Sequence, residues 1–155
     1  MDAKFMRIAI ALSIENVRSG RGGPFGAVIT KGDEIVATGA NQVTPANDPT
    51  AHAEIVAIRA ACQKLSGFQL TDCDLYTSCE PCPMCLGAIY WARPDQVYYA
   101  SSREDAACAG FDDEFIYSQI TLPVDRRKIP MHQVLQQEAE AAFQAWEEML
   151  NKVRY

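Results

Sequence analysis

The amino-acid sequence predicts a single domain of the α/β class. A short apolar strand, a helix and a second strand follow one another at residues 74–77, 82–92 and 96–100. Residues 25–38 have the period-two pattern of a β-hairpin, with a glycine in the central turn. A chain of 155 residues, 48% of them apolar, is long enough to bury a core and does not require a second domain.

An amphipathic helix is predicted at the start of the chain, over residues 1–19. Phe5, Ile8 and Leu12 recur there at helical spacing. Gly20 follows directly, as is common where a helix ends. The apolar face of this helix is expected to pack on the sheet.

Residues 41–49 are rich in Asn, Thr and Pro and are predicted to form a loop, which makes them a candidate wall for a ligand site. Asp48 followed by Pro49 predicts the start of a helix that carries His52 and Glu54 in its first turns. Residues two apart do not face each other within a helix. Both side chains are therefore expected to reach a cavity that lies off the helix end.

The helix at residues 82–92 is predicted to begin near Pro81 or Cys82, because proline is favoured at the first helical position. Cys82 and Cys85 are three residues apart and so share one face of its first turn. A helix N-terminus and a bound cation both favour thiolate over thiol. We expect this helix start and the one near His52 to converge on one metal ion.

The C-terminal part of the chain has weaker patterns. Residues 102–125 lack clean periodicity and are predicted to be irregular, with short helical pieces. Residues 131–135 are predicted to form a last strand, and residues 138–152 a terminal helix with a mixed apolar face.

His52, Cys82 and Cys85 are the candidate metal ligands. One imidazole and two thiolates can hold a zinc ion and leave a fourth position open for water, which is typical of a catalytic site. Glu54 would then act as a proton acceptor and not as a ligand. The alternative is a structural zinc site closed by Cys79, which would give a binding module. A closed site leaves Glu54 without a role, so we expect Cys79 to be unligated and to lie beside the pocket.

The charge balance argues against a nucleic-acid-binding protein. The net charge is −6, and the one tight basic run, Arg126-Arg127-Lys128, is expected to be solvated surface. No apolar run reaches membrane-spanning length, and no signal peptide is recognised. Six cysteines suit metal binding and core packing more than disulfides. A cytoplasmic enzyme that binds neither nucleic acid nor a membrane is expected.

His52-Ala53-Glu54 followed by Pro81-Cys82-Pro83-Met84-Cys85 resembles the H-x-E and P-C-x-x-C signature of zinc-dependent deaminases. Four longer segments resemble the guanine deaminase branch of the cytidine-deaminase-like superfamily, namely residues 22–28, 47–54, 76–92 and 110–113. The resemblance implies a three-layer α/β/α sandwich around a mixed five-stranded sheet. It also implies a homodimer, in which the C-terminal segment could be exchanged between the two copies.

Carried over residue by residue, the resemblance assigns zinc to His52, Cys82 and Cys85, and proton transfer to Glu54. It further implies a purine pocket lined by five side chains, some of which could reach across the dimer: Phe25, Asn41, Trp91, Asp113 and Tyr155.

From the residues alone, the same side chains have plainer interpretations. Phe25 and Trp91 are aromatic residues of a kind more often found in a core than in a pocket. Asn41 could cap a turn, and Asp113 could cap a loop. Their assignment to the pocket rests on the resemblance.

The activity that the resemblance implies is hydrolytic deamination of guanine to xanthine and ammonia in purine catabolism. Zinc is the expected cofactor, and no organic cofactor is needed. A nucleoside deaminase acting on guanosine or cytidine is the main alternative. A deaminase of tRNA or single-stranded DNA is less favoured, because it would need a basic surface for phosphates.

Overall fold

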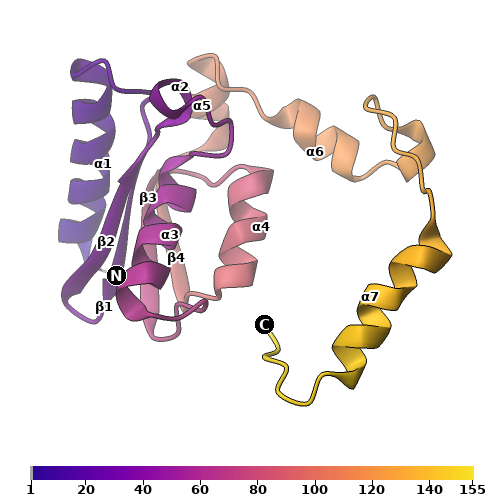
Figure 1. The fold of residues 1–155 in the computed structure, drawn as a ribbon. Coiled ribbons are helices and arrows are strands. Elements are labelled where there is room, and N and C mark those ends of the chain that lie inside the picture. The colour runs from indigo at the N-terminus through magenta and orange to yellow at the C-terminus, as the bar shows by residue number, and fades with distance from the viewer. Residues whose placement is uncertain (1) are drawn as a thin grey trace. The chain divides into compact units, whose positions relative to one another are not determined.

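The computed structural model describes residues 2–155. The chain divides into two compact units, Met1–Asp113 and Glu114–Tyr155. The first unit contains a β-sheet with helices on both faces, and the second contains helices joined by loops (Figure 1). The organisation of residues 1–155 as one domain stays a prediction.

Helix α1, Ala3–Arg18, confirms the helix predicted at the start of the chain; Met1 lies outside the described residues. Its first turn is capped by the Asp2 side chain, which accepts a hydrogen bond of 2.8 Å from the Lys4 backbone N–H. Gly20 has a φ of 68°, a left-handed conformation that glycine adopts readily. The helix therefore ends where the sequence predicts.

The sheet of the first unit has four strands: β1 Gly26–Lys31, β2 Glu34–Ala40, β3 Cys73–Cys79 and β4 Gln96–Ser101. Their order is β2-β1-β3-β4. Strand β1 pairs antiparallel with both β2 and β3, whereas β3 and β4 are parallel, so the sheet is mixed. The predicted hairpin is confirmed, and so are the two strands that flank the cysteine-bearing helix.

The expected fifth strand is absent from the residues that the structure describes. Residues 131–135 are not extended into a strand, and Leu135 has a left-handed φ of 54°. A strand needs a neighbour to pair its backbone N–H and C=O groups. The unit Glu114–Tyr155 contains helical elements and no strand with which residues 131–135 could pair. The prediction of a strand at residues 131–135 is therefore wrong for this chain taken alone.

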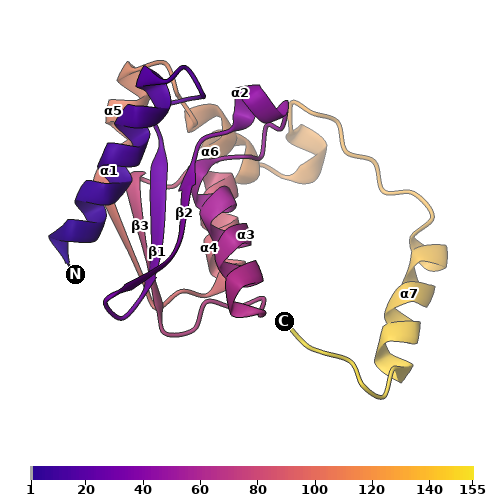
Figure 2. The same ribbon diagram turned by 60° about the vertical axis from the view of Figure 1, so that its left-hand side comes forward.

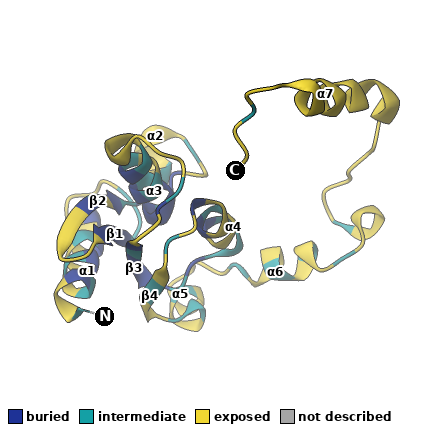
Figure 3. Cartoon of the chain, turned by 90° about the horizontal axis from the view of Figure 1, so that it is seen from below, coloured by how far each residue is buried: buried dark blue, intermediate teal, exposed yellow. Residues whose placement is uncertain are grey.

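The first unit has three layers. Helices α3, Ala53–Leu65, and α4, Pro83–Ala92, lie side by side on one face of the sheet (Figure 2). Ala27 and Ile29 of β1 pack against that helical layer. Val28 points to the other face, where it packs with Phe5 of α1. Buried residues accordingly concentrate in the sheet and on the facing sides of these helices (Figure 3).

Two glycines allow helices to approach the sheet closely. A Cβ added at Gly26 would clash with the Ala9 carbonyl oxygen of α1, and one added at Gly39 would clash with the Ala53 carbonyl oxygen of α3. Gly26 pairs with Ala40 in the sheet, next to Gly39. Helices α1 and α3 are thus fixed on opposite faces at the same end of the β1–β2 pair.

The remaining helices are short or exposed. They are α2 Val43–Ala46, α5 Arg103–Cys108, α6 Glu114–Ile120, the 3₁₀ helix η1 Val124–Arg126, and α7 Gln136–Glu148. Helix α2 is a short helical turn within residues 41–49, so the loop predicted there is confirmed only for the residues on either side of it. The prediction of irregular chain with helical pieces at residues 102–125 is confirmed, as is a terminal helix. None of the helices described within residues 2–155 combines the length and apolar character needed to span a membrane.

Candidate functional site

His52 is the N-cap residue of α3 and not a residue within a helical turn. The predicted start of this helix at Pro49 is wrong. The Asp48 carboxylate instead accepts hydrogen bonds from the Thr50 backbone N–H at 2.8 Å and the Thr50 hydroxyl at 2.7 Å. Such local bonds favour a turn over a helix. His52 follows in an extended conformation, with φ −69° and ψ 157°, so that its backbone lies outside the helix.

Cys82 has the same place in its own segment, since it is the N-cap residue of α4, with φ −65° and ψ 168°. Pro83 follows at the first helical position, where its missing N–H costs nothing. Cys85 lies one turn into the helix and is fully buried. Two helix N-termini therefore present His52, Cys82 and Cys85 at one place, as the sequence predicts.

The distances within this group fit a tetrahedral zinc site. The Nδ1 atom of His52 lies 3.5 Å from the Sγ atoms of both Cys82 and Cys85. One ligand atom from each of the three residues lies within 4.8 Å of the others. Tetrahedral bonds of about 2.05 Å to nitrogen and about 2.3 Å to sulfur place those atoms about 3.5 Å apart. Three ligands leave a fourth position for water.

Cys79 is not part of this group. Its thiol donates a hydrogen bond of 3.5 Å to the Ser102 carbonyl oxygen. Burial raises the pKa of the Cys79 thiol to about 11, with a smaller contribution from the negative charge of Glu54. The Cys79 sulfur is not among the ligand atoms that lie within 4.8 Å of one another. A site closed by Cys79 is therefore not what the geometry supports.

The two cysteines of the group have opposite electrostatic character. A hydrogen bond from Cys85, followed by one from His52, lowers the pKa of Cys82 to about 4. The same bond, together with burial, raises the pKa of Cys85. The pair thus holds one negative charge at neutral pH before any metal binds. A dication adjacent to both sulfurs would favour the second thiolate as well.

Glu54 lies in the first turn of α3 and is 6% exposed. Burial is the largest cause that raises its pKa, and the negative charge of Cys82 adds to it. A hydrogen bond with Cys85 opposes this shift, which places the carboxylate against the metal group. A buried carboxylate beside the metal group is placed to accept a proton from water and later to release it.

Asn41 and Phe25 come together at the end of the β1–β2 pair. Asn41 is 7% exposed and its side-chain oxygen accepts bonds from the Gly23 and Val43 backbone N–H groups, at 3.4 and 3.3 Å. Phe25 meets Phe111 edge to face, with ring centroids 4.9 Å apart. Phe25, Phe111 and Cys79 line part of a hollow of about 260 Å³. None of His52, Glu54, Cys82 or Cys85 lines this hollow, so the position of Cys79 beside the metal-site pocket stays a prediction.

Asp113 lies near the metal group. Burial raises the pKa of its carboxyl, the negative charge of Cys82 adds to this, and Arg103 opposes it. Trp91 lies at the opposite end of α4 from Cys85 and is 63% exposed. Tyr155 belongs to the unit Glu114–Tyr155 and is also exposed. The pocket roles of Trp91 and Tyr155 stay predictions.

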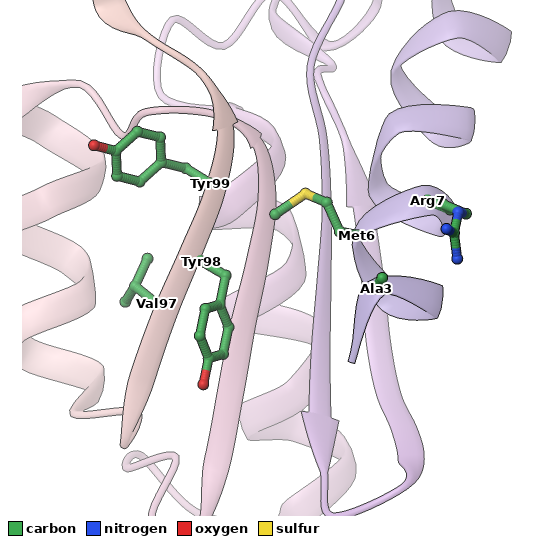
Figure 4. Close-up of a pocket in the computed structure, with 6 residues that line it drawn as sticks. All are labelled: Ala3, Met6, Arg7, Val97, Tyr98 and Tyr99. Carbon is green, nitrogen blue, oxygen red and sulfur yellow. The ribbon is translucent and has the colours of Figure 1, made fainter. Parts of the chain in front are cut away.

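A second hollow, of about 450 Å³, lies between α1 and strand β4, away from the metal group (Figure 4). It is lined by Ala3, Met6 and Arg7 of α1 and by Val97, Tyr98 and Tyr99 of β4. It contains neither a metal ligand nor a predicted pocket residue. It does border the outer strand of the sheet.

Two residues near the site were not predicted to contribute to it. Phe111 falls in an irregular stretch whose partner, Phe25, is distant in sequence. Asn16 is 3% exposed and hydrogen-bonds to the loops beside the pocket. In the sequence, the feature that could have identified Asn16 is its position: it is a polar residue on the same face of α1 as the apolar residues Phe5 and Leu12.

Similarity to known proteins extends over the whole chain. The family model of the cytidine and deoxycytidylate deaminase zinc-binding region matches residues 1–101. The guanine deaminase of Bacillus subtilis (strain 168) is 58% identical over 151 residues, which cover 97% of each protein. A crystal structure of a B. subtilis guanine deaminase superposes with a TM-score of 0.97 at 57% identity, covering 100% of this chain and 99% of that one. The tRNA-specific adenosine deaminase of Buchnera aphidicola subsp. Schizaphis graminum is 36% identical over 104 residues, 67% of this chain and 68% of that protein.

Proposed function

The chain belongs to the cytidine and deoxycytidylate deaminase zinc-binding family, and from this premise we propose that it hydrolyses guanine to xanthine and ammonia. The observation that carries the reaction type is the buried carboxylate of Glu54 beside a His-Cys-Cys group of zinc-binding geometry. The choice of guanine is supported by 58% identity to a guanine deaminase over almost the entire length of both proteins.

Metal binding and proton transfer are carried out by different residues of the site. His52, Cys82 and Cys85 would hold zinc, which when bound supplies Lewis-acid activation of water at neutral pH. Glu54 accepts the proton that the water loses on attacking C2, the carbon that bears the amino group. It returns this proton to the adjacent ring nitrogen. It then takes the remaining proton of the new C2 hydroxyl group and passes it to the amino group, so that the C2–N bond breaks, ammonia leaves and the C2 carbonyl of xanthine forms. One carboxylate thus serves as base and then as acid.

Substrate recognition would use the polar groups at the mouth of the site. The side-chain oxygen of Asn41 accepts two backbone hydrogen bonds, which leaves its amide nitrogen to donate to an acceptor on the purine. The Asp113 carboxylate could accept bonds from a ring N–H and an amino group. Phe25, fixed by Phe111, offers an aromatic surface to the flat base.

The experiment that tests this function is ammonia release by zinc-loaded protein on a panel of substrates. The panel contains guanine, guanosine, adenine, cytosine, cytidine and a structured tRNA. Release from guanine that depends on Glu54 supports the proposal. A kcat/KM that is higher for guanosine or cytidine by orders of magnitude would replace it with a nucleoside deaminase. Activity only on the tRNA would instead point to the function of the tRNA-specific relative.

We propose further that the protein is a homodimer and that the C-terminal segment is exchanged between copies. Helix α4 leaves Leu86, Tyr90 and Trp91 exposed, which is unusual for so apolar a helix. Helix α7 buries none of its residues, and Phe143 is 72% exposed. Apolar surface of this kind is typical of an interface between chains.

The same arrangement would complete a five-stranded sheet. Strand β4 is the outer strand beside β3, so its other edge carries backbone N–H and C=O groups with no neighbouring strand among the described residues. Residues 131–135 of a second copy could pair there and cover the adjacent hollow between α1 and β4. This would also explain why residues 131–135 form no strand in one chain.

Mixing two inactive variants tests the exchange. In a swapped dimer of Glu54→Gln and Tyr155→Ala chains, the site that keeps Glu54 receives an intact Tyr155 from its partner. Unfolding and refolding the two variants together should therefore restore activity that neither has alone. Recovery no greater than the sum of the separate variants would mean that each site uses its own C-terminus. Mass measurement in solution gives the oligomeric state independently.

The location of the protein stays a prediction. None of the six cysteines forms a disulfide. Free thiols are typical of proteins kept in a reducing compartment, and we accordingly propose that the protein acts in the cytoplasm.

A further inference from the structure

Asn16 of α1 is a buried side chain that connects two loops beside the proposed pocket. Its amide nitrogen donates to the Gly23 carbonyl oxygen and to the Asn41 carbonyl oxygen, both at 2.9 Å. An asparagine amide has two N–H donors, and both are used here. One side chain therefore ties the loop before Phe25 to the loop that begins at Asn41.

The packing around Asn16 leaves little freedom for this connection. Helix α1 touches the sheet at Gly26, where an added Cβ would lie 2.8 Å from the Ser13 backbone nitrogen. Asn16 lies one turn further along the same face of the helix. At Gly22, an added Cβ would clash with the Asn41 carbonyl oxygen and lie 2.9 Å from the Asn16 amide nitrogen. The Gly22 backbone thus packs directly against the Asn16–Asn41 hydrogen bond.

Asn41 is held on its other sides by backbone groups. Its N–H donates to the Phe25 carbonyl oxygen at 3.1 Å. Its side-chain oxygen accepts from Gly23 and Val43, as described above. With Asn16 on its carbonyl, every hydrogen-bonding group of Asn41 except the amide nitrogen is engaged within the described structure. The rotamer that presents this nitrogen therefore depends on where the two loops are held.

We propose that Asn16 is a positioning residue of the substrate pocket, which orients the Asn41 amide by fixing the loops at residues 22–25 and 41–42. This proposal rests on the function proposed above. Asn16 itself does not touch the substrate, and it acts through Asn41. A displacement of such a contact by about 1 Å can cost roughly a hundredfold in rate, so loss of Asn16 should be visible in kinetics.

A double-mutant cycle separates this role from a general loss of stability. Asn16→Ala should lower kcat/KM for guanine by roughly tenfold to a hundredfold in the wild-type background. In an Asn41→Ala background, the same change should lower kcat/KM by less than about threefold, because the group that Asn16 orients is gone. Equal losses in the two backgrounds, or no loss in either, would overturn the proposal.

Thr30→Val is the matched control. Thr30 is a buried polar residue of β1 and lies toward the end of that strand distant from Phe25. It should leave kcat/KM unchanged. Should Asn16→Ala fail to fold, Asn16→Ser keeps one donor and should give a smaller loss with the same dependence on Asn41. Zinc content should equal that of the wild type in all these variants.

Amide hydrogen exchange tests the positioning without any assay of turnover. The reporters are the Gly23 and Val43 N–H groups, which bond to the Asn41 side chain, and the Asn41 N–H itself. Asn16→Ala should speed their exchange, and Thr30→Val should not. Unchanged exchange at all three overturns the proposal. A wild-type protein inactive on guanine would refute the proposed function alone, and the exchange result would still decide the role of Asn16.

Discussion

The Sγ atom of Cys82 lies 3.5 Å from the Nδ1 atom of His52, although 30 residues separate them in sequence. Both are N-cap residues, of α4 and α3, and both have extended backbone conformations. A residue at the N-cap is outside the helical turn, so its side chain can point along the helix end to a group shared with another helix. Each helix start also contributes a positive partial charge, which favours thiolates between them.

Replacement of Glu54 by Gln should abolish turnover and keep the metal. The amide has the shape of the carboxyl group but cannot accept the proton, and loss of such a group typically costs about 10²- to 10⁴-fold in kcat. Zinc content should stay at the wild-type value, because Glu54 is not one of the three ligands. Glu15→Gln, on the exposed face of α1, is the control and should behave as wild type. Loss of zinc from the Glu54 variant would instead make this residue a ligand or a support of the ligands.

Two cysteine variants should differ in zinc content. Cys85→Ala removes one of the three ligands and should lose zinc during purification. Cys79→Ala removes only a thiol that donates to Ser102 and should keep one zinc per chain with most of its activity. Elemental analysis of both proteins makes the comparison. A zinc-free Cys79 variant would revive the structural site with four protein ligands.

In metal-free protein, Cys82 should be the reactive thiol. Its pKa is lowered to about 4, so it is a thiolate at all pH values well above 4, whereas an ordinary thiol deprotonates at about 8.5. The pKa of Cys79 is raised to about 11, so it stays a neutral thiol at neutral pH. Alkylation by iodoacetamide at pH 6, followed by peptide mapping, should therefore label Cys82 and spare Cys79.

Zinc should protect Cys82 from this labelling. The rate of labelling in metal-free protein should rise with pH through about 4 and reach a plateau below neutrality. A rate that rises only near pH 8.5 would show that Cys82 is an ordinary thiol.

The ligands could be predicted from sequence because the chemistry is local to two short motifs. A histidine and two cysteines near predicted helix starts, with a glutamate two residues after the histidine, already define a metal and a proton acceptor. The exact start of α3 could not be predicted in this way. The two bonds from Asp48 to Thr50 form a turn at the place where Asp-Pro suggests a helix cap, so the helix begins at Ala53 instead.

Other features depend on contacts between distant parts of the chain. The pattern at residues 131–135 is compatible with a strand, but a strand forms only where a partner edge is available. In the sequence, Asn16 is only a polar residue that interrupts the apolar face of α1. Its role becomes visible only when the loops that carry Gly23 and Asn41 are seen on either side of it.

Two glycine-to-alanine changes should have opposite effects on stability. At Gly39, an added Cβ would clash with the Ala53 carbonyl oxygen and lie 2.7 Å from the Ala57 backbone nitrogen. These are backbone atoms of α3, and they cannot move aside as the flexible end of a side chain can. Gly39→Ala should therefore lower the free energy of unfolding by about 1–3 kcal/mol. Gly87 lies within α4 and has no atoms within 4 Å of an added Cβ. Gly87→Ala should therefore raise the free energy of unfolding by about 0.5–1 kcal/mol, since alanine is the better helix former.

The Gly39→Ala substitution should also affect zinc binding and catalysis. Ala53 lies between His52 and Glu54, so a shift of α3 away from β2 moves a zinc ligand and the proton acceptor together. We expect Gly39→Ala to lower kcat/KM and to weaken zinc retention, whereas Gly87→Ala should leave the catalytic residues in place. Denaturant unfolding of both variants, with zinc content and guanine turnover measured on the same samples, makes the test. A Gly39→Ala protein as stable and active as wild type would mean that α3 is not held to the sheet by this close contact.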